Sequence, residues 1–257
     1  MELCIDTSTR FAGVALTQNA RVIKVAYWHS NTSHTLELSS TILQMLVTQK
    51  KSIADVRTII ISKGPGAFSA LRVGMGFAKG LSEALGIPLI SISTLEIEAA
   101  RYFDSVQGPL CPLLEVGKDR IAWSLYQRTT NGWSLSMPEQ ITALDAMVNA
   151  VPTGTVFCGE GAWNTISELH KLVKNGTEIH ADPPPTRLLH ILGTLGLLAL
   201  SSGVGSDSTS TEPNYIRSPS ITMPTGTKQK EQLALKRKHN RRFTRARRPN
   251  NTGVDQA

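Results

Sequence analysis

A glycine-rich loop at residues 63–70, Lys-Gly-Pro-Gly-Ala-Phe-Ser-Ala, contains the residues best suited to binding a phosphate group. Gly64 and Gly66 can adopt positive φ and let a ligand or a second backbone come close. The loop follows a β-like run at 58–62 and precedes a helix predicted over 69–85, whose first N–H groups could face an anion. The alternative is a tight strand-to-helix turn without a ligand.

A carboxylate and several hydroxyl groups end the first predicted strand, in the run Asp6-Thr7-Ser8-Thr9. A carboxylate at this position could hold a cation or a water molecule beside a phosphate. The alternative is that Asp6 or Ser8 only hydrogen-bonds the backbone of its own turn. The candidate cofactor-binding residues are therefore Asp6, Thr7, Gly64, Gly66 and Ser69.

Several common catalytic patterns are missing from the sequence. No Gly-Lys-Ser/Thr follows Gly64, so the loop is not a P-loop, and the strand predicted at 89–92 does not end in the acidic residue of a dinucleotide-binding fingerprint. No G-x-S-x-G elbow occurs, and no histidine pair has H-x-x-x-H spacing, since Leu38 lies four residues after His34. We therefore predict no catalytic residue and no metal ligand.

Positive charge is concentrated at the end of the sequence. Residues 1–223 hold 17 Lys and Arg against 18 Asp and Glu, whereas residues 224–257 hold 10 against 2. A basic stretch of this kind is attracted to polyanions, so we predict contact with RNA, with a solvated tail as the alternative. The candidate nucleic-acid contacts are Lys236, Arg237, Lys238, Arg241 and Arg242.

The cysteines and the apolar runs indicate the cellular compartment. Cys4, Cys111 and Cys158 show no C-x-x-C spacing, which argues against a zinc site and a disulfide framework. No apolar run reaches the roughly 18 to 20 residues of a membrane helix, and the sequence does not open with a leader pattern. We expect a cytoplasmic protein without a membrane segment.

Hydrophobic periodicity predicts an α/β fold in two parts. In the first part, residues 3–7, 13–17 and 22–28 are predicted as antiparallel strands with a turn at 18–20, and helices alternate with strands after them. A second part repeats this order, with Asn131-Gly132 as a hairpin turn. It also contains a helix predicted near 163–173 and a last helix predicted over 186–200. The predicted domains are a first lobe at 1–106, a second lobe at 107–217 and a basic tail at 218–257.

The two long helices predicted in the first lobe, at 36–47 and 69–85, have unusually wide apolar arcs. In the second helix the arc spans roughly 200°, against the roughly 100° expected of a helix that covers one sheet. Burial against the sheet and against each other explains part of each arc. The remainder predicts a docking surface for a partner, formed by Leu36, Leu43, Leu71, Gly74, Met75 and Ala78.

Several motifs occur together in the order found in one family. They are Leu-Cys-Ile-Asp-Thr-Ser-Thr at the start, His34-Thr35, the loop Gly-Pro-Gly-Ala-Phe-Ser-Ala-Leu-Arg-Val-Gly, Ser-Thr-Leu-Glu at 93–96 and Pro-Asn-Tyr-Ile-Arg at 213–217. With these motifs the chain resembles the bacterial TsaB (YeaZ) family over about 215 residues.

The resemblance implies a fold of two ribonuclease-H-like lobes, as in the actin-like ATPase and sugar kinase superfamily. It implies a noncatalytic subunit for making tRNA threonylcarbamoyladenosine (t6A), which pairs through its first-lobe helices with the catalytic subunit TsaD. A small ATPase, TsaE, docks on the pair, and tRNA is bound through the complex. Catalytic relatives carry H-x-x-x-H for a metal, so Leu38 at the position of the second His is the expected loss.

The sequence leaves other functions and assemblies open. The loop departs from the usual family pattern at Ala67, Ser69 and Ala70, and the second-lobe segment Val116-Gly-Lys-Asp-Arg120 is also divergent. ATP or ADP at the interface of the complex, and a homodimer of the isolated chain, are left open. The rival from the enzyme class is a self-sufficient ATP-dependent transferase or phosphohydrolase that uses the glycine loop and Asp6.

Overall fold

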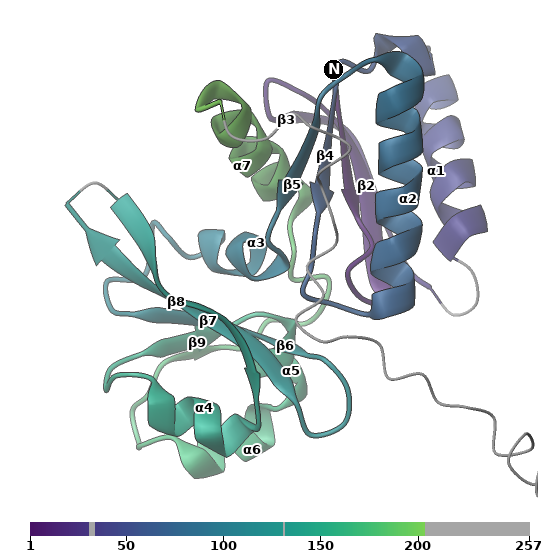
Figure 1. Ribbon diagram of the computed structural model, residues 1–257. Coiled ribbons are helices and arrows are strands. Elements are labelled where there is room, and N and C mark those ends of the chain that lie inside the picture. Colours follow the sequence, from purple (N-terminus) through teal and green to yellow (C-terminus); the bar gives the residue numbers. More distant parts are fainter. Residues whose placement is uncertain (31–33, 131, 204–257) are drawn as a thin grey trace, which may run out of the picture. The chain divides into compact units, whose positions relative to one another are not determined.

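The computed structural model describes residues 1–30, 34–130 and 132–203 (Figure 1). Within these ranges the chain forms two five-stranded mixed sheets. The first contains β1 (Glu2–Asp6), β2 (Phe11–Gln18), β3 (Arg21–His29), β4 (Thr58–Ser62) and β5 (Leu89–Ile92) in the order β3-β2-β1-β4-β5. Strands β1, β2 and β3 pair antiparallel, whereas β4 and β5 extend the sheet in parallel with β1.

The second sheet repeats this topology. Its strands are β6 (Leu110–Glu115), β7 (Ile121–Thr129), β8 (Gly132–Thr142), β9 (Val156–Cys158) and β10 (Ile179–His180), in the order β8-β7-β6-β9-β10. Three antiparallel strands are again followed by two parallel ones. The predicted α/β fold with two ribonuclease-H-like lobes is confirmed.

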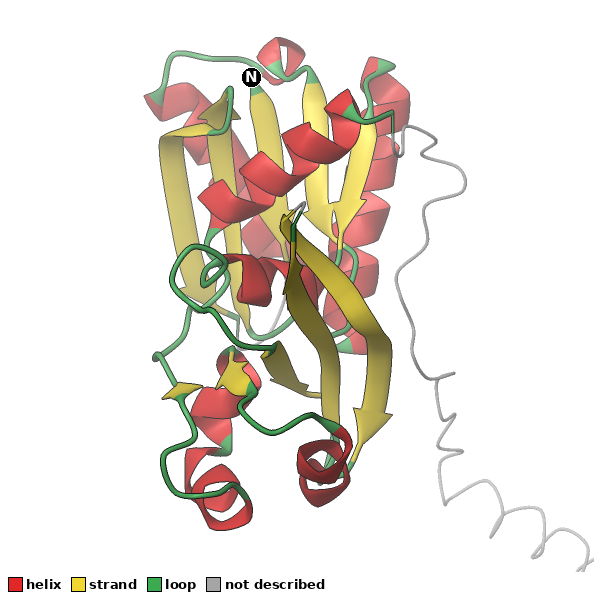
Figure 2. Ribbon diagram, turned by 90° about the vertical axis from the view of Figure 1, so that its left-hand side faces the viewer, coloured by secondary structure: helices red, strands yellow, loops and turns green. Residues whose placement is uncertain are grey.

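Helices cover both faces of the first sheet. One face holds α1 (His34–Thr48) and α2 (Phe68–Leu85), and the opposite face holds α7 (Leu189–Ser201), which crosses in front of the strands in Figure 2. Side chains alternate along β1, so Leu3 and Ile5 pack under α1 and α2 while Cys4 packs under α7. The short 3-10 helix η1 (Ile53–Asp55) precedes β4.

Glycines bring α7 close to the first sheet. A Cβ atom at Gly196 would lie 2.3 Å from Cγ2 of Ile60, and one at Gly193 would lie 3.3 Å from Sγ of Cys4. Larger side chains at these positions would push the helix away from β1 and β4. The glycines therefore explain how a helix so rich in leucine can pack tightly on this face.

One helix that follows each sheet in the sequence packs against the other sheet. Helix α3 (Thr94–Ala100) follows the first sheet but packs against β6 of the second, whereas α7 follows the second sheet and packs on the first. The second lobe retains α4 (Leu144–Ala150), α5 (Glu160–Asn164) and α6 (Ile166–Leu172). The predicted second lobe at 107–217 thus includes a helix that packs on the first lobe. The predicted tail at 218–257 lies outside the described residues.

In the part of the chain that the structure describes, no helix combines the length and apolar character needed to cross a membrane.

Candidate functional site

A cluster of buried charges joins the two lobes around Arg187. Its guanidinium donates through Nε to Oδ2 of Asp6 at 2.6 Å, and through Nη1 to Oε1 of Glu98 at 2.9 Å and Oε2 of Glu160 at 2.7 Å. Asp6 ends β1, Glu98 lies on α3 and Glu160 begins α5, so one side chain contacts three elements. We call these four residues the interlobe cluster. Their side chains are buried, and Arg187 is only 1% exposed.

The carboxyl groups of the interlobe cluster differ in their preferred charge. Burial alone would raise the pKa of Asp6, but the Arg187 guanidinium and hydrogen bonds from Ser62 and Ser8 outweigh it and lower that pKa. For Glu98, burial outweighs the same guanidinium and raises the pKa. Oε2 of Glu98 is buried without a hydrogen-bond partner among the described residues. Relative to carboxyl groups in water, the ionised form is therefore stabilised at Asp6 and destabilised at Glu98.

The glycine loop is packed against the turn after β1. Gly64 has φ of 105°, and a Cβ atom at Gly66 would lie 2.2 Å from the carbonyl oxygen of Ser8. That same oxygen accepts a hydrogen bond of 2.7 Å from the backbone N–H of Ala67. Gly66 is thus needed for close contact between two backbones, and Gly64 for the positive φ of the loop.

Both carboxylate oxygens of Asp6 accept hydrogen bonds from within the chain. Oδ1 of Asp6 accepts hydrogen bonds from the Ser8 N–H at 2.9 Å, the Ser8 hydroxyl at 2.6 Å and the Ser62 hydroxyl at 2.6 Å, while Oδ2 is held by Arg187. Both oxygens are therefore already used. Within the described ranges, no group of three His, Cys, Asp or Glu side chains could hold a metal ion.

The other predicted cofactor residues lie in or beside the same loop and differ in exposure. The Thr7 hydroxyl is buried and donates to the carbonyl oxygen of Ala70 at 2.9 Å, whereas Ser69 is exposed. The carbonyl oxygen of Gly64 accepts from the backbone N–H of Thr94 at 2.9 Å. That Asp6, Thr7, Gly64, Gly66 and Ser69 bind a cofactor stays a prediction. Because their polar groups already have partners, Asp6, Thr7 and Gly64 connect parts of the fold.

The outer faces of α1 and α2 carry a surface that the described part of the chain leaves uncovered. Leu36, Leu43 and Val47 are 72%, 61% and 74% exposed, and their spacing places them along one side of α1. On α2, Gly76 and Gly80 face open space, since a Cβ atom at either position would meet no atom within 4 Å. Helices α1 and α2 contact each other. We call these five residues the α1/α2 face.

Part of the predicted docking surface lies inside the molecule. Leu71, Met75 and Ala78 are at most 3% exposed, and a Cβ atom at Gly74 would lie 2.2 Å from Oγ1 of Thr7. Met75 and Ala78 belong to the core between α2 and the sheet. The prediction that Leu71, Gly74, Met75 and Ala78 form the docking surface is wrong because these residues form the inner side of α2. For Leu36 and Leu43, contact with a partner stays a prediction.

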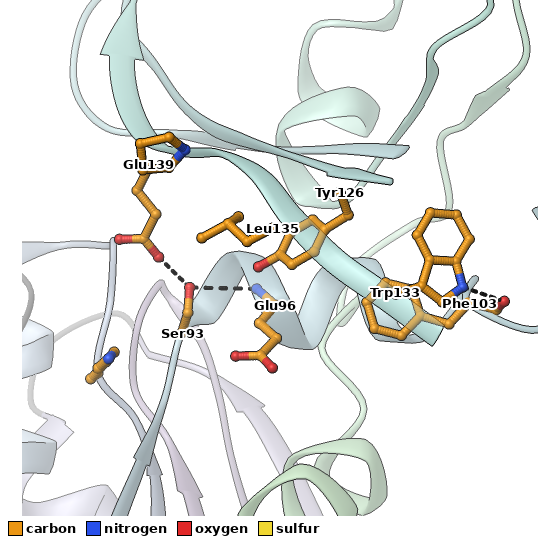
Figure 3. Close-up of a pocket in the computed structure, with 9 residues that line it drawn as sticks. Ser93, Glu96, Phe103, Tyr126, Trp133, Leu135 and Glu139 are labelled. Carbon is orange, nitrogen blue, oxygen red and sulfur yellow. Dashed lines mark hydrogen bonds between the residues drawn. The ribbon is translucent and has the colours of Figure 1, made fainter. Parts of the chain in front are cut away.

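A pocket of about 530 Å³ opens where the first lobe meets the β7–β8 hairpin (Figure 3). Its polar residues lie at the ends of β4 and β5, on α3 and on β8, and its aromatic residues follow α3 or lie on β7 and β8. The lining residues are Lys63, Ser93, Glu96, Phe103, Tyr126, Trp133, Leu135, Pro138 and Glu139. The sequence motifs did not predict this pocket.

The predicted nucleic-acid contacts Lys236, Arg237, Lys238, Arg241 and Arg242 lie outside the described residues.

A protein-family model described as "TsaD: tRNA N6-adenosine threonylcarbamoyltransferase" matches residues 29–188, which is more than half of the chain. Curated relatives named "tRNA threonylcarbamoyladenosine biosynthesis protein TsaB" are 29% identical over 140 residues in Bacillus subtilis and 28% identical over 131 residues in Escherichia coli. The chain belongs to this family, as a TsaB/YeaZ member. The alignments with these two relatives cover 54% and 51% of this chain. They cover 60% and 56% of the relatives' own lengths, so the chain spans less than two thirds of each relative.

A solved TsaB/YeaZ structure supports the fold. The structure titled "YeaZ from Pseudomonas aeruginosa" superposes with a TM-score of 0.70 at 24% sequence identity, and the match covers 83% of this chain and 98% of that one. At this identity the likeness concerns the fold. It agrees with the two repeated sheets described above.

The interlobe cluster was not predicted from the sequence. Arg187 and Asp6 are 181 residues apart, and Arg187 lies within a helix predicted to start at residue 186. The sequence holds one local signal, because Glu98 lies in the largely apolar run Thr94–Ala100. In the structure Glu98 is fully buried. A buried charge requires a partner. The signal therefore indicates a buried ion pair but does not identify the partner.

Proposed function

We propose that the chain is a noncatalytic subunit in t6A biosynthesis, which binds a TsaD-type catalytic subunit through the α1/α2 face. Family membership and the names of the relatives support the process. A TsaE-type ATPase and tRNA belong to this proposal as further members of the complex. The proposed location is the cytoplasm, where tRNA is modified.

The exposed aliphatic side chains on α1 are the observation that carries the docking proposal. Leu36, Leu43 and Val47 leave apolar surface in water, and burying each against a partner would contribute about 1.5–3 kcal/mol. On the neighbouring helix α2, Gly76 and Gly80 carry no side chain, so a partner helix could approach the α2 backbone closely. Large aliphatic side chains beside a flat helix surface suit helix-to-helix packing.

The noncatalytic role is supported by the state of the glycine loop and Asp6. The loop packs against the turn at Ser8, and both carboxylate oxygens of Asp6 already accept hydrogen bonds. This arrangement supports the noncatalytic role over the rival, a self-sufficient ATP-dependent enzyme that uses the same residues. Binding of ATP or ADP at an interface with the partner stays a prediction, as does a homodimer of the isolated chain.

Affinity for the TsaD-type subunit of the same organism tests the proposal. Leu43→Glu places a charge in the α1/α2 face and should weaken the complex by about 30-fold or more, as loss of a central interface contact does. Isothermal titration calorimetry measures the dissociation constant. Because Leu43 is 61% exposed, the substitution should change the free energy of unfolding of the isolated chain by less than about 0.5 kcal/mol.

A matched control separates docking from a general effect of surface charge. Leu198 on α7 is 59% exposed but lies on the opposite face of the first sheet, so Leu198→Glu should leave the affinity unchanged. Equal affinities for the unaltered chain and the Leu43→Glu chain would refute docking through this face. Equal weakening by both substitutions would also count against it.

A further inference from the structure

The interlobe cluster places three carboxyl groups around a single guanidinium. Asp6, Glu98 and Glu160 all pair with Arg187, and the last two share its Nη1 atom, at 2.9 Å and 2.7 Å. Within the described ranges no second cation pairs with these carboxyl groups. With all three ionised, the cluster would therefore hold two uncompensated negative charges. A buried charge without a partner is so costly that the group usually takes up a proton instead.

The hydrogen bonds of Glu98 differ between its two oxygen atoms. Oε1 accepts from the Thr186 hydroxyl at 2.6 Å, from Nη1 of Arg187 at 2.9 Å and from the backbone N–H of Glu160 at 3.3 Å. Oε2 is buried and has no hydrogen-bond partner among the described residues. An ionised carboxylate spreads its charge over both oxygens, so half of that charge would lie without a donor. In a neutral acid, Oε1 is the carbonyl oxygen that accepts, and Oε2 carries the proton.

The environment of Glu98 also distinguishes it from the other two acids. At Asp6 both oxygens accept hydrogen bonds, which stabilises the ionised form. The side chain of Glu98 is fully buried, whereas that of Glu160 is 10% exposed and accepts a further hydrogen bond of 3.1 Å from the Thr9 hydroxyl. Burial raises the pKa of Glu98 despite the attraction to Arg187, in agreement with these contacts.

The other elements that pack against α3 bring no further charge to Glu98 in the described part of the chain. The Cys158 thiol, at the end of β9, lies 4.0 Å from the Glu98 carbonyl oxygen, and burial raises its pKa well above the ordinary value. Burial also raises the pKa of Tyr126 on β7. The charged side chains of β6, β7 and α7 are exposed, namely Glu115, Arg128 and His190. The four members of the cluster therefore set its proton balance.

We propose that Glu98 holds one proton in the folded chain, and that this proton keeps the joint between the two lobes closed. Glu98 lies on α3, which packs on the second sheet, and contacts Arg187, which leads into α7 on the first sheet. It also accepts from the N–H of Glu160 at the start of α5.

Loss of this proton should loosen the joint. It would place negative charge beside the Glu160 carboxyl group, which shares Nη1 of Arg187, and like charges repel strongly in a buried site. The contacts of α3 with α5 and with Arg187 should therefore weaken as the pH rises. The proposal does not depend on the function proposed above.

Nuclear magnetic resonance of the full chain labelled with ¹³C tests for the proton directly. The Cδ resonance of each Glu moves when its carboxyl group ionises. At about pH 6 an ordinary Glu, with a pKa of about 4.3, is almost fully ionised. Glu98 should then still show the chemical shift of a protonated acid, whereas the exposed Glu168 on α6 should show that of a carboxylate. Ionisation of Glu98 at the same pH as Glu168 would overturn the proposal.

The pH dependence of stability counts the proton independently. Since the folded chain would keep this proton at pH values where the unfolded chain has lost it, stability should fall as the pH rises above the ordinary Glu pKa. One linked proton changes the folding equilibrium constant by up to about tenfold per pH unit. Glu98→Gln resembles the neutral acid and should remove this part of the dependence, whereas Glu168→Gln should leave it in place. Urea unfolding between about pH 5 and pH 7 measures the dependence, and equal steepness in the unaltered and Glu98→Gln chains would contradict the proposal.

Hydrogen–deuterium exchange tests the effect on the joint. After correction for the intrinsic pH dependence of exchange, α3 and α5 should exchange faster once Glu98 ionises, whereas α1, which holds no member of the cluster, should not change. In Glu98→Gln this step should be absent. Unchanged protection of α3 and α5 after Glu98 has ionised would refute the role of the proton in the joint. If Glu98→Gln does not fold, the resonance of Glu98 and the exchange of the unaltered chain still decide.

Discussion

Replacing Arg187 tests the role of the interlobe cluster most severely. Arg187→Met keeps a long side chain but removes the positive charge that faces Asp6, Glu98 and Glu160. Removing one partner of a buried ion pair costs about 3–5 kcal/mol, because the remaining charge stays buried without compensation. Since whole domains are stable by about 5–15 kcal/mol, this is a large loss. For a chain of this size it corresponds to a fall in melting temperature of roughly 6–20 °C.

The loss should depend on pH in a defined direction. In the unaltered chain, the lowered pKa of Asp6 stabilises the fold above the ordinary Asp pKa, and this contribution disappears as the pH falls through the folded value. Without Arg187, burial should raise the pKa of the remaining carboxyl groups, so the folded state should bind more protons than the unfolded state. The stability deficit of Arg187→Met should then be larger at about pH 8 than at about pH 5.

Urea unfolding at both pH values measures this deficit. Arg101→Met is a suitable control because Arg101 pairs with Asp182 at 3.1 Å but is 28% exposed, so its loss should cost at most about 1 kcal/mol. A deficit for Arg187→Met below about 1 kcal/mol, or one of equal size at both pH values, would refute the assigned role of the cluster.

Three further outcomes are expected from the packing and charges. Gly196→Ala should lower the free energy of unfolding by about 1–3 kcal/mol because its Cβ atom meets Ile60, and a stability equal to that of the unaltered chain in thermal melts would contradict this. Gly76→Ala makes the same change in open space and should raise the stability of the isolated chain by about 0.5–1 kcal/mol; a loss in urea unfolding would oppose the described geometry. At about pH 7, Glu98→Gln should be tolerated better than Asp6→Asn, because burial raises the pKa of Glu98 and so makes its charge costly, whereas Arg187 lowers the pKa of Asp6 and stabilises its charge. The reverse order of melting temperatures would show that the charges are assigned wrongly.

Short apolar runs allowed the central strands to be predicted closely. The runs at 58–62 and 89–92 coincide with β4 and β5, because continuous β-branched and aliphatic residues suit a parallel strand that is buried on both faces. The turn before β3 was also predicted, and Asn19 and Ala20 adopt φ of 52° and 62° there. Local composition was sufficient for these elements.

Tertiary contacts determine the element boundaries that the sequence alone did not predict. The single helix predicted near 163–173 is interrupted at Thr165, which separates α5 from α6. The last helix, predicted from residue 186, begins at Leu189 because Thr186 and Arg187 turn their side chains to Glu98. The two-residue strand β10 is too short to produce a periodic signal.

The apolar arc of α2 shows why the docking surface was only partly predicted. Helical periodicity identifies a wide apolar side but does not tell which part faces the sheet. In the structure, Leu71, Met75 and Ala78 take the inner positions, whereas Gly76 and Gly80 lie on the outer side. The exposed residues Leu36 and Leu43 on α1 belonged to the predicted set, and their contact with a partner stays a prediction.

Hydrogen–deuterium exchange of this chain with and without a TsaD-type subunit tests the central claim most directly. Docking through the α1/α2 face should slow exchange in α1 and α2, while α4 and α6 of the second lobe should exchange as in the isolated chain. Slower exchange confined to the second lobe or to α7, with α1 and α2 unchanged, would contradict the proposed interface.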